Sequence, residues 1–215
     1  KYGPAWAYDQ LALRREVEYY IKESMGRHEV MPWGGGHDEG TSLIPHCRYY
    51  LLTGDKVVLG FLRGMLERKA EWFRKNNYHG WAADTDAHHE IEDFGGFVSV
   101  MYFLDPGNQT ATSMIEDVAH HVGNWVEEVP AWYDWDRHVF RSVWFGTKSV
   151  RDYPPWNFSE WTHIRFCQLT LTAYLATGKE RYLQLCRDHA DMWCKLIEES
   201  DEAVPVAMYP VESEK

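Results

Sequence analysis

The sequence lacks any run of apolar residues long enough to span a bilayer. It also lacks a basic excess, because 22 Lys and Arg stand against 33 Asp and Glu and leave a net charge of −11. General binding to nucleic acid needs a basic face, so we expect neither a nucleic-acid nor a membrane partner. No signal peptide is visible. The compartment stays open, with an exported or periplasmic protein as one expectation.

Cysteine is scarce and is not arranged for metal binding. None of Cys47, Cys167, Cys186 and Cys194 forms a C-x-x-C pair, and each lies within an apolar helical pattern. The pattern predicts buried free thiols, and it indicates neither a zinc site nor a disulfide framework.

A dense cluster of titratable residues lies in 78–94, where three His and five acidic groups fall within seventeen residues. An apolar helical pattern begins at Phe94. Because burying unpaired charge is costly, such a cluster at the start of a buried helix indicates a functional site. Helix capping accounts for Asp86 or Glu90, but it does not require His88 and His89 beside them.

Apolar periodicity predicts an all-α protein. The expected helices cover 9–25, 41–52, 56–75, 89–104, 110–128, 158–176 and 180–198. The stretch 129–157 is expected to be irregular but ordered, because it is rich in aromatic residues. We expect one domain over 1–200 and a surface tail or linker over 201–215.

The chain repeats a hairpin turn. Tyr50-Leu51-Leu52-Thr53-Gly54-Asp55 is echoed by Tyr174-Leu175-Ala176-Thr177-Gly178-Lys179, and 102–107 is a looser copy. Each copy joins an apolar helix to an amphipathic one, which is typical of an αα-hairpin repeat. The apolar helices are expected to form a parallel inner layer, covered on all sides, and the amphipathic helices an outer layer.

The repeat also aligns functional groups. Counted back from each turn, the inner helices are expected to begin near His37, His89 and Trp161, with His163 close behind. Because these helices run in one direction, their starts converge on one rim. We therefore predict that one cavity is lined by three His with neighbouring polar groups: His37, His89, His163, Asp38, Glu90 and Tyr78.

The turn motif and the alternation of helices resemble the α/α-toroid (six-hairpin) carbohydrate-active enzymes, which include polysaccharide lyases and glycoside hydrolases. The resemblance covers about residues 9–199. It implies a substrate cleft at the rim and a polysaccharide or oligosaccharide substrate. The chain supplies about three and a half hairpins and not six, so we expect the rest of a larger chain or a second subunit to complete the ring.

We prefer the hypothesis that the residues at the rim catalyse a lyase reaction. Lyases of this class resemble one another in using Tyr and His as base and acid, with Asn, His or Arg neutralising the uronate. His89 is the favoured catalytic residue, with Asp86 and Glu90 placed to hold its tautomer. Tyr78 or Tyr153 would protonate the leaving oxygen, as a general acid. Arg165 would hold a carboxylate in bidentate fashion, or else pair with a neighbouring acid.

Two further hypotheses about the rim residues stay open, a hydrolase and a metal site. A hydrolase needs two carboxylates, and the rim offers Asp38, Glu39, Asp84, Asp86, Glu90 and Glu160. A Zn or Mn site would use His37, His88 and His89 with a carboxylate, although adjacent His on a helix diverge by about 100°. We therefore expect no cofactor at the rim.

Tryptophan favours a carbohydrate ligand, because a flat indole face fits the apolar face of a pyranose. Of the 11 Trp, four fall in or beside the rim loops: Trp33, Trp81, Trp156 and Trp161. With His88, Asp86 and Arg165 they form the predicted substrate-binding set. Stacked αα-hairpins also build non-catalytic scaffolds that bind a glycan or a protein, and this reading stays open.

Overall fold

The structure, a computed structural model, describes residues 4–31, 37–200 and 204–208. Helices dominate it, and each strand in these ranges has only two residues, so the all-α prediction is confirmed. The helices are α1 (Pro4–Val30), α2 (His37–Thr41), α3 (Ile44–Thr53), α4 (Lys56–Asn76), α5 (Ala87–Asp93), the π-helix η1 (Phe94–Val98), α6 (Ser99–Leu104), α7 (Gln109–Val122), the 3-10 helix η2 (Trp161–His163), α8 (Ile164–Thr177) and α9 (Glu180–Glu198).

The short strands pair in three antiparallel ribbons. They are β1 (Thr85–Asp86) with β4 (Trp144–Phe145), β2 (Tyr133–Asp134) with β3 (Val139–Phe140), and β5 (Ser159–Glu160) with β6 (Ala207–Met208). The last ribbon pairs residues 207–208, which belong to the expected tail over 201–215, with the two residues that precede η2. There the Trp161 amide also donates to the Val206 carbonyl over 3.1 Å.

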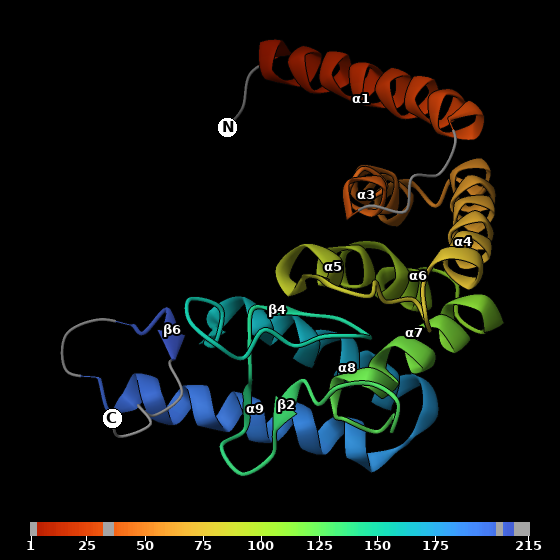
Figure 1. Ribbon diagram of the computed structural model, residues 1–215. Helices are drawn as coiled ribbons and strands as arrows, with labels where there is room; N and C mark the ends of the chain where they lie inside the picture. Colours follow the sequence, from red (N-terminus) through yellow and green to blue (C-terminus); the bar gives the residue numbers. More distant parts are fainter. Residues whose placement is uncertain (1–3, 32–36, 201–203, 209–215) are drawn as a thin grey trace.

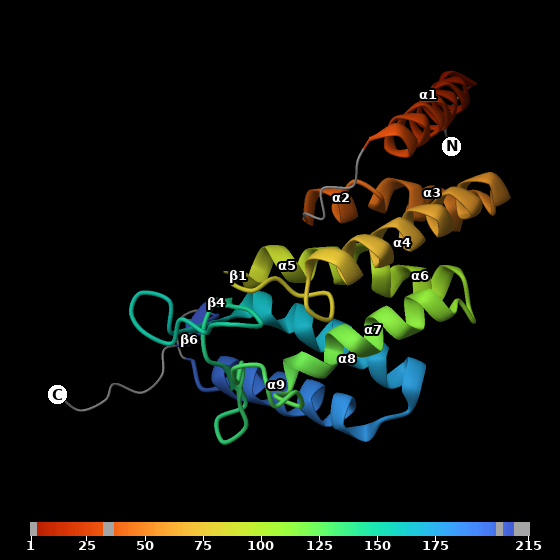
Figure 2. The ribbon, with the colours of Figure 1, turned by 45° about the vertical axis from the view of Figure 1, so that its right-hand side comes forward.

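The helices stack one after another through the molecule, from α1 to α9 (Figures 1 and 2). α3 contacts α6, and α6 contacts α8. The lead-in segments also touch, α2 with α5 and α5 with η2. At the opposite end the Tyr102 hydroxyl donates to the Leu175 carbonyl over 3.0 Å. The N-terminal ends of these helices lie side by side, and so do their C-terminal ends. The helices α3, α6 and α8 therefore run in the same direction.

The repeated turns share one geometry. Gly54 and Gly178 have φ of 67° and 70°, and their amides donate to the carbonyls of Tyr50 and Tyr174 over 2.8 and 2.7 Å. Glycine suits both positions because it adopts the left-handed region without a Cβ penalty. The looser copy differs, because α6 ends before Asp105, whose carboxylate binds Arg63 over 2.8 Å and 2.5 Å.

The core is aromatic and is shared between the helices and the stretch 129–157. Trp132, Phe140 and Phe145 of this stretch are buried against Phe166 of α8 or its neighbours. The strand pair β1–β4 fixes this stretch beside the start of α5. The stretch 129–157 was expected to be irregular but ordered. Packing explains why it is ordered, since its aromatic residues cover one end of the helix stack.

Several helix predictions were wrong in detail. The helix expected over 9–25 spans Pro4–Val30, and the short helix α2 was not predicted. The helix expected over 110–128 ends at Val122, because Asn124 turns into the left-handed region with φ 62°. The Asn124 side chain accepts from the amides of Trp132 and Tyr133 over 2.7 and 3.1 Å. This tertiary bonding overrides an apolar pattern that continued past Val122.

The helix expected over 89–104 is interrupted by the π-helix η1. η1 contains Gly95 and Gly96, which let neighbouring helices approach closely. A Cβ on Gly96 would lie 3.1 Å from Ile44 Cδ1, and Gln168 donates to the Gly95 carbonyl over 3.3 Å. Short π-helical segments within α-helices are rare and often lie at functional sites.

Apolar side chains remain exposed on α1 and on α8. Leu13 and Val17 of α1 are 58% and 43% exposed, whereas Met192 and Leu196 of α9 are half-buried. Leu171 and Leu175 are also exposed, so the expectation that inner helices are covered on all sides was wrong for α8.

The cysteine prediction has a mixed outcome. All four cysteines are free, and Cys47 and Cys167 are buried, but Cys194 is exposed because it lies on the outer face of α9. No helix in the described ranges combines the length and apolarity that crossing a membrane requires.

Candidate functional site

The starts of α2, α5 and η2 lie next to one another, and we call this region the rim. α5 is the central member, because it contacts both α2 and η2. The strand β1 leads directly into α5, and the Ala87 amide donates to the Val143 carbonyl over 3.1 Å. The pairing of β1 with β4 and the hydrogen bond of the Ala87 amide thus fix the position of the first turn of α5, which contains titratable residues.

Asp86 caps α5 and lies beside His89. Its Oδ1 accepts from the His88 amide over 2.9 Å, as an N-cap residue does. Its Oδ2 lies 3.5 Å from His89 Nδ1. The His89 side chain is 51% exposed. A carboxylate at Nδ1 favours the tautomer with the proton there and leaves Nε2 as the basic nitrogen.

Glu92 links His88 on α5 to Arg165 on α8. Its Oε1 accepts from Arg165 Nη1 over 2.6 Å, and His88 Nε2 lies 3.5 Å from the same oxygen. All three side chains are about one-third exposed or less. Arg165 therefore pairs with a neighbouring acid, which was the alternative to holding a substrate carboxylate.

His163 lies beneath the rim and is buried. Its Nδ1 accepts from the Glu160 amide over 3.2 Å and lies 3.1 Å from Ser159 Oγ. Because Nδ1 accepts a backbone N–H, the ring proton is on Nε2, which has no hydrogen-bond partner among the described residues. Burial, with the charges of His189 and His88, holds the pKa of His163 well below its usual value. His163 is therefore a neutral core residue.

Lys69 is a rim-side residue that the sequence analysis missed. It is buried on α4, and burial lowers the pKa of its amine to about 7 against the opposing effects of Glu90 and Glu39. Glu90 Oε1 also accepts from the Ala82 amide over 3.1 Å. A sequence signal existed, because Lys69 falls on the apolar stripe of α4 between Leu66 and Phe73. Asp38, at the start of α2, is exposed.

The four predicted Trp platforms differ in placement. Trp81 is 1% exposed and donates its indole N–H to the Val118 carbonyl over 2.9 Å, so its assignment to substrate binding was wrong. Trp161 is 55% exposed at the rim. Trp156 is half-buried, with Arg151 over its ring at 5.6 Å. Trp33 and the side chain of His37 lie outside the described residues.

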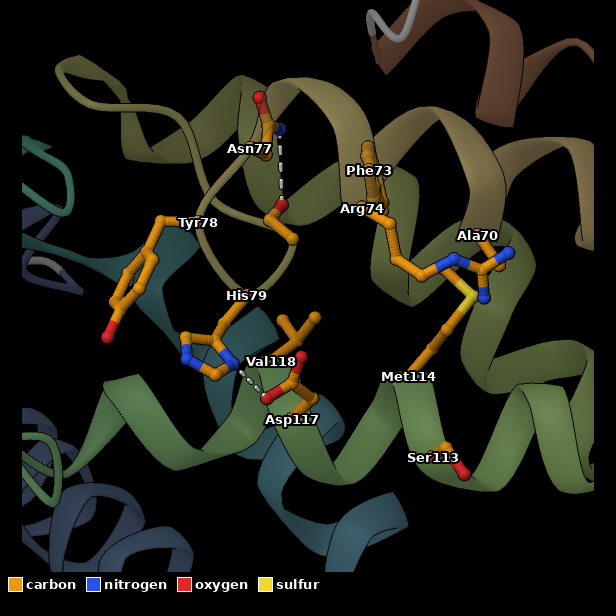
Figure 3. A pocket seen from close by; sticks show the side chains of 11 residues that line it. Ala70, Phe73, Arg74, Asn77, Tyr78, His79, Ser113, Met114, Asp117 and Val118 are labelled. Atoms are coloured by element: carbon orange, nitrogen blue, oxygen red, sulfur yellow. Dashed lines mark hydrogen bonds and ion pairs between the residues drawn. The ribbon is translucent and has the colours of Figure 1, made fainter.

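Tyr78 lines a cleft between α4 and α7, and neither His89 nor His163 lines this cleft (Figure 3). Its ring packs against those of His79 and His121, with centroids 4.3 and 5.7 Å away. The prediction that one cavity holds His89, His163 and Tyr78 was therefore wrong. His89 is exposed at the rim, His163 is buried below it, and Tyr78 faces the other cleft.

Comparisons with family models, with curated proteins and with solved structures gave no match. Within the described ranges, no group of three or more His, Cys, Asp or Glu is placed to hold a metal ion. His88 and His89 lie side by side, but their rings are 5.2 Å apart at 73° and engage different carboxylates.

Proposed function

We propose that the chain is a carbohydrate-active enzyme, or part of one, that depolymerises a polysaccharide at the rim. The observation that carries the proposal is the contact of α2, α5 and η2 at their starts, which gathers His89, Asp86, Glu92 and Arg165 in one region. The parallel helices with their outer partners support an arc of an α/α toroid as the architecture.

Lyase chemistry is the reaction that we favour. β-Elimination on a uronate requires a base near the α-proton and a cation that offsets the carboxylate. His89, oriented by Asp86, supplies the base, with its Nε2 turned away from the carboxylate partner. Arg165 supplies the cation once a substrate carboxylate competes with Glu92 for its guanidinium. Trp161 offers an exposed indole face for a neighbouring sugar ring.

Glycoside hydrolysis is the second candidate, because carboxylates outnumber cations at the rim. Helix α2 contributes Asp38 and Glu39, and α5 contributes Glu90. Asp86, at the end of β1, is the N-cap of α5. Glu90 and Glu39 also oppose the lowering of the Lys69 pKa, so both lie near that buried amine. A carboxylate pair across the α2–α5 contact would act as acid and base.

The deciding experiment is a screen of the purified chain against uronate-rich and neutral glycans. Absorbance of the unsaturated product reports elimination, and reducing ends without that absorbance report hydrolysis. Unsaturated product from a uronate glycan supports the lyase, and reducing ends alone support the hydrolase. Binding of glycans without either product would leave a non-catalytic scaffold as the remaining reading.

A further inference from the structure

A cleft of about 410 Å³ lies between α4 and α7, apart from the rim (Figure 3). Its apolar floor comes from Phe73, Met114 and Val118. Its polar groups come from both helices and from the loop that follows α4, and they are Arg74, Asn77, Tyr78, His79, Ser113 and Asp117. Small-molecule sites are typically concave and mostly apolar, with a few placed polar groups and volumes of roughly 300–1,000 Å³.

The loop over 77–81 is fastened to α7, so the cleft is preformed. The Trp81 indole donates to the Val118 carbonyl over 2.9 Å, and His79 Nδ1 bonds to the Asp117 carboxylate. Gly80 has φ 80°, and a Cβ there would lie 2.7 Å from Val118 Cγ2. Only glycine allows the loop to approach α7 this closely without a shift of Val118.

His79 is held in an unfavourable conformation. Its φ is 47°, in the left-handed region that non-glycine residues seldom adopt. Such conformations persist where the surroundings over-determine them, and they cluster at ligand sites. The Asp117 bond and the packing of the His79 ring against Tyr78 and His121 provide that constraint, at 4.3 and 5.2 Å between centroids.

Arg74 gives the cleft a cation. Its side chain extends from α4 over the space between the two helices (Figure 3). It makes no hydrogen bond or ion pair with any residue in the part of the chain that the structure describes. The neighbouring Lys75, by contrast, bonds to Glu71 over 2.6 Å and does not line the cleft. Arg74 is thus available to an anionic ligand.

We propose that this cleft binds a small monocarboxylic acid carried on a six-membered ring. The ring face packs on Phe73, Met114 and Val118, and the carboxylate pairs with the Arg74 guanidinium. Tyr78 and the His79–Asp117 pair meet the substituents on the other side of the ring. An aromatic acid and a uronic acid monosaccharide share this chemistry, and the proposal does not depend on the reaction at the rim.

The test uses the full chain with ¹³C-labelled methionine methyl groups, observed by NMR. Met114 lines the cleft, and the other six of the 7 Met do not, so they serve as internal references. Benzoate and galacturonate are titrated separately, with benzyl alcohol and galactose as their neutral counterparts. We expect a saturable shift of the Met114 methyl with at least one acid and at least tenfold weaker binding of its neutral counterpart. The acid that binds identifies the source.

Arg74→Gln is the diagnostic variant, and Lys75→Gln is its matched control one residue away. We expect Arg74→Gln to weaken binding of the acid by about tenfold or more, because a charge-assisted bond is lost. Lys75→Gln should bind as the wild type does. Unchanged shifts of the six reference methyls show that each variant is folded. The proposal is overturned if neither acid shifts Met114 saturably, or if Arg74→Gln binds the acid as tightly as the wild type.

Discussion

Arg165 on α8 donates a hydrogen bond to Glu92 on α5 over 2.6 Å, which ties the last turn of α5 to the start of α8. Both side chains are partly screened from water, at 33% and 23% exposure. A half-buried pair of this kind contributes more than a fully exposed one, whose usual worth is about 0–1 kcal/mol. The pair therefore contributes to the stability of the contact between α5 and α8.

The first prediction measures this pair by a double-mutant cycle. Arg165→Met and Glu92→Gln should each lower the free energy of unfolding by about 1–2 kcal/mol, because each removes a charge-assisted hydrogen bond from a partly buried partner. The double variant should lose less than the sum of the two, with a coupling of about 1 kcal/mol. Urea denaturation provides the values. Strict additivity would mean that the two side chains do not interact in solution.

The second prediction concerns His89. If it is the general base, His89→Ala should lower turnover of the glycan found in the screen by about 10²-fold or more, with the fold intact. His120→Ala is the matched control, because His120 lies on α7 and bonds to Arg181, away from the rim. Turnover and circular dichroism are measured for both. Near-normal turnover in folded His89→Ala would remove His89 from the chemistry.

Local signals in the sequence located most of the helices. Apolar periodicity located the helices, and Gly54 and Gly178 marked the turns, because each end is decided by a residue's own backbone preference. The end of α7 was missed for the opposite reason. Asn124 is turned by bonds to Trp132 and Tyr133, which follow several residues later and leave no local signature.

The candidate site was only partly predictable. The contact of α2, α5 and η2 followed from counting back along the repeat, since parallel helices of similar length align their starts. Burial did not follow, because it depends on what packs from elsewhere. Trp81 is covered by α7 and by Trp132, and His163 by Phe140, so two residues expected at a surface lie in the core.

The third prediction concerns acid stability and His121. Burial, with the charges of His79 and His120, lowers the pKa of His121 to about 3, and neither ring nitrogen has a partner among the described residues. The unfolded chain binds a proton near its usual pKa of about 6.5, so His121 lowers stability progressively as the pH falls below that value. Above about 6.5 its native neutral form costs nothing through titration.

His121→Phe should therefore stabilise the protein more at low pH than at neutral pH. It removes an unpaired buried polar group and keeps the stacking on Trp132, whose ring lies 5.7 Å away. The stability difference from the wild type should grow by about 1–2 kcal/mol between about pH 7 and about pH 5. Urea denaturation at both pH values measures it. A pH-independent difference would show that His121 titrates normally in the folded chain.

The last prediction compares two helical glycines. Gly60 lies on the exposed face of α4, where an added Cβ meets nothing within 4 Å. Gly60→Ala should therefore raise stability by about 0.5–1 kcal/mol, because alanine restricts the unfolded chain and favours the helix.

Gly96 lies in the π-helix η1, where an added Cβ meets Ile44 Cδ1 at 3.1 Å. Gly96→Ala gains the same helix preference, but the Ile44 side chain has to shift by a few tenths of an ångström to admit the Cβ, and overpacking of this kind costs about 1–3 kcal/mol. We expect it to be less stable than the wild type by about 1 kcal/mol, while Gly60→Ala is more stable. Thermal unfolding of both variants tests the contrast. Equal stabilisation by the two substitutions would show that α3 and η1 do not require the close approach that Gly96 permits.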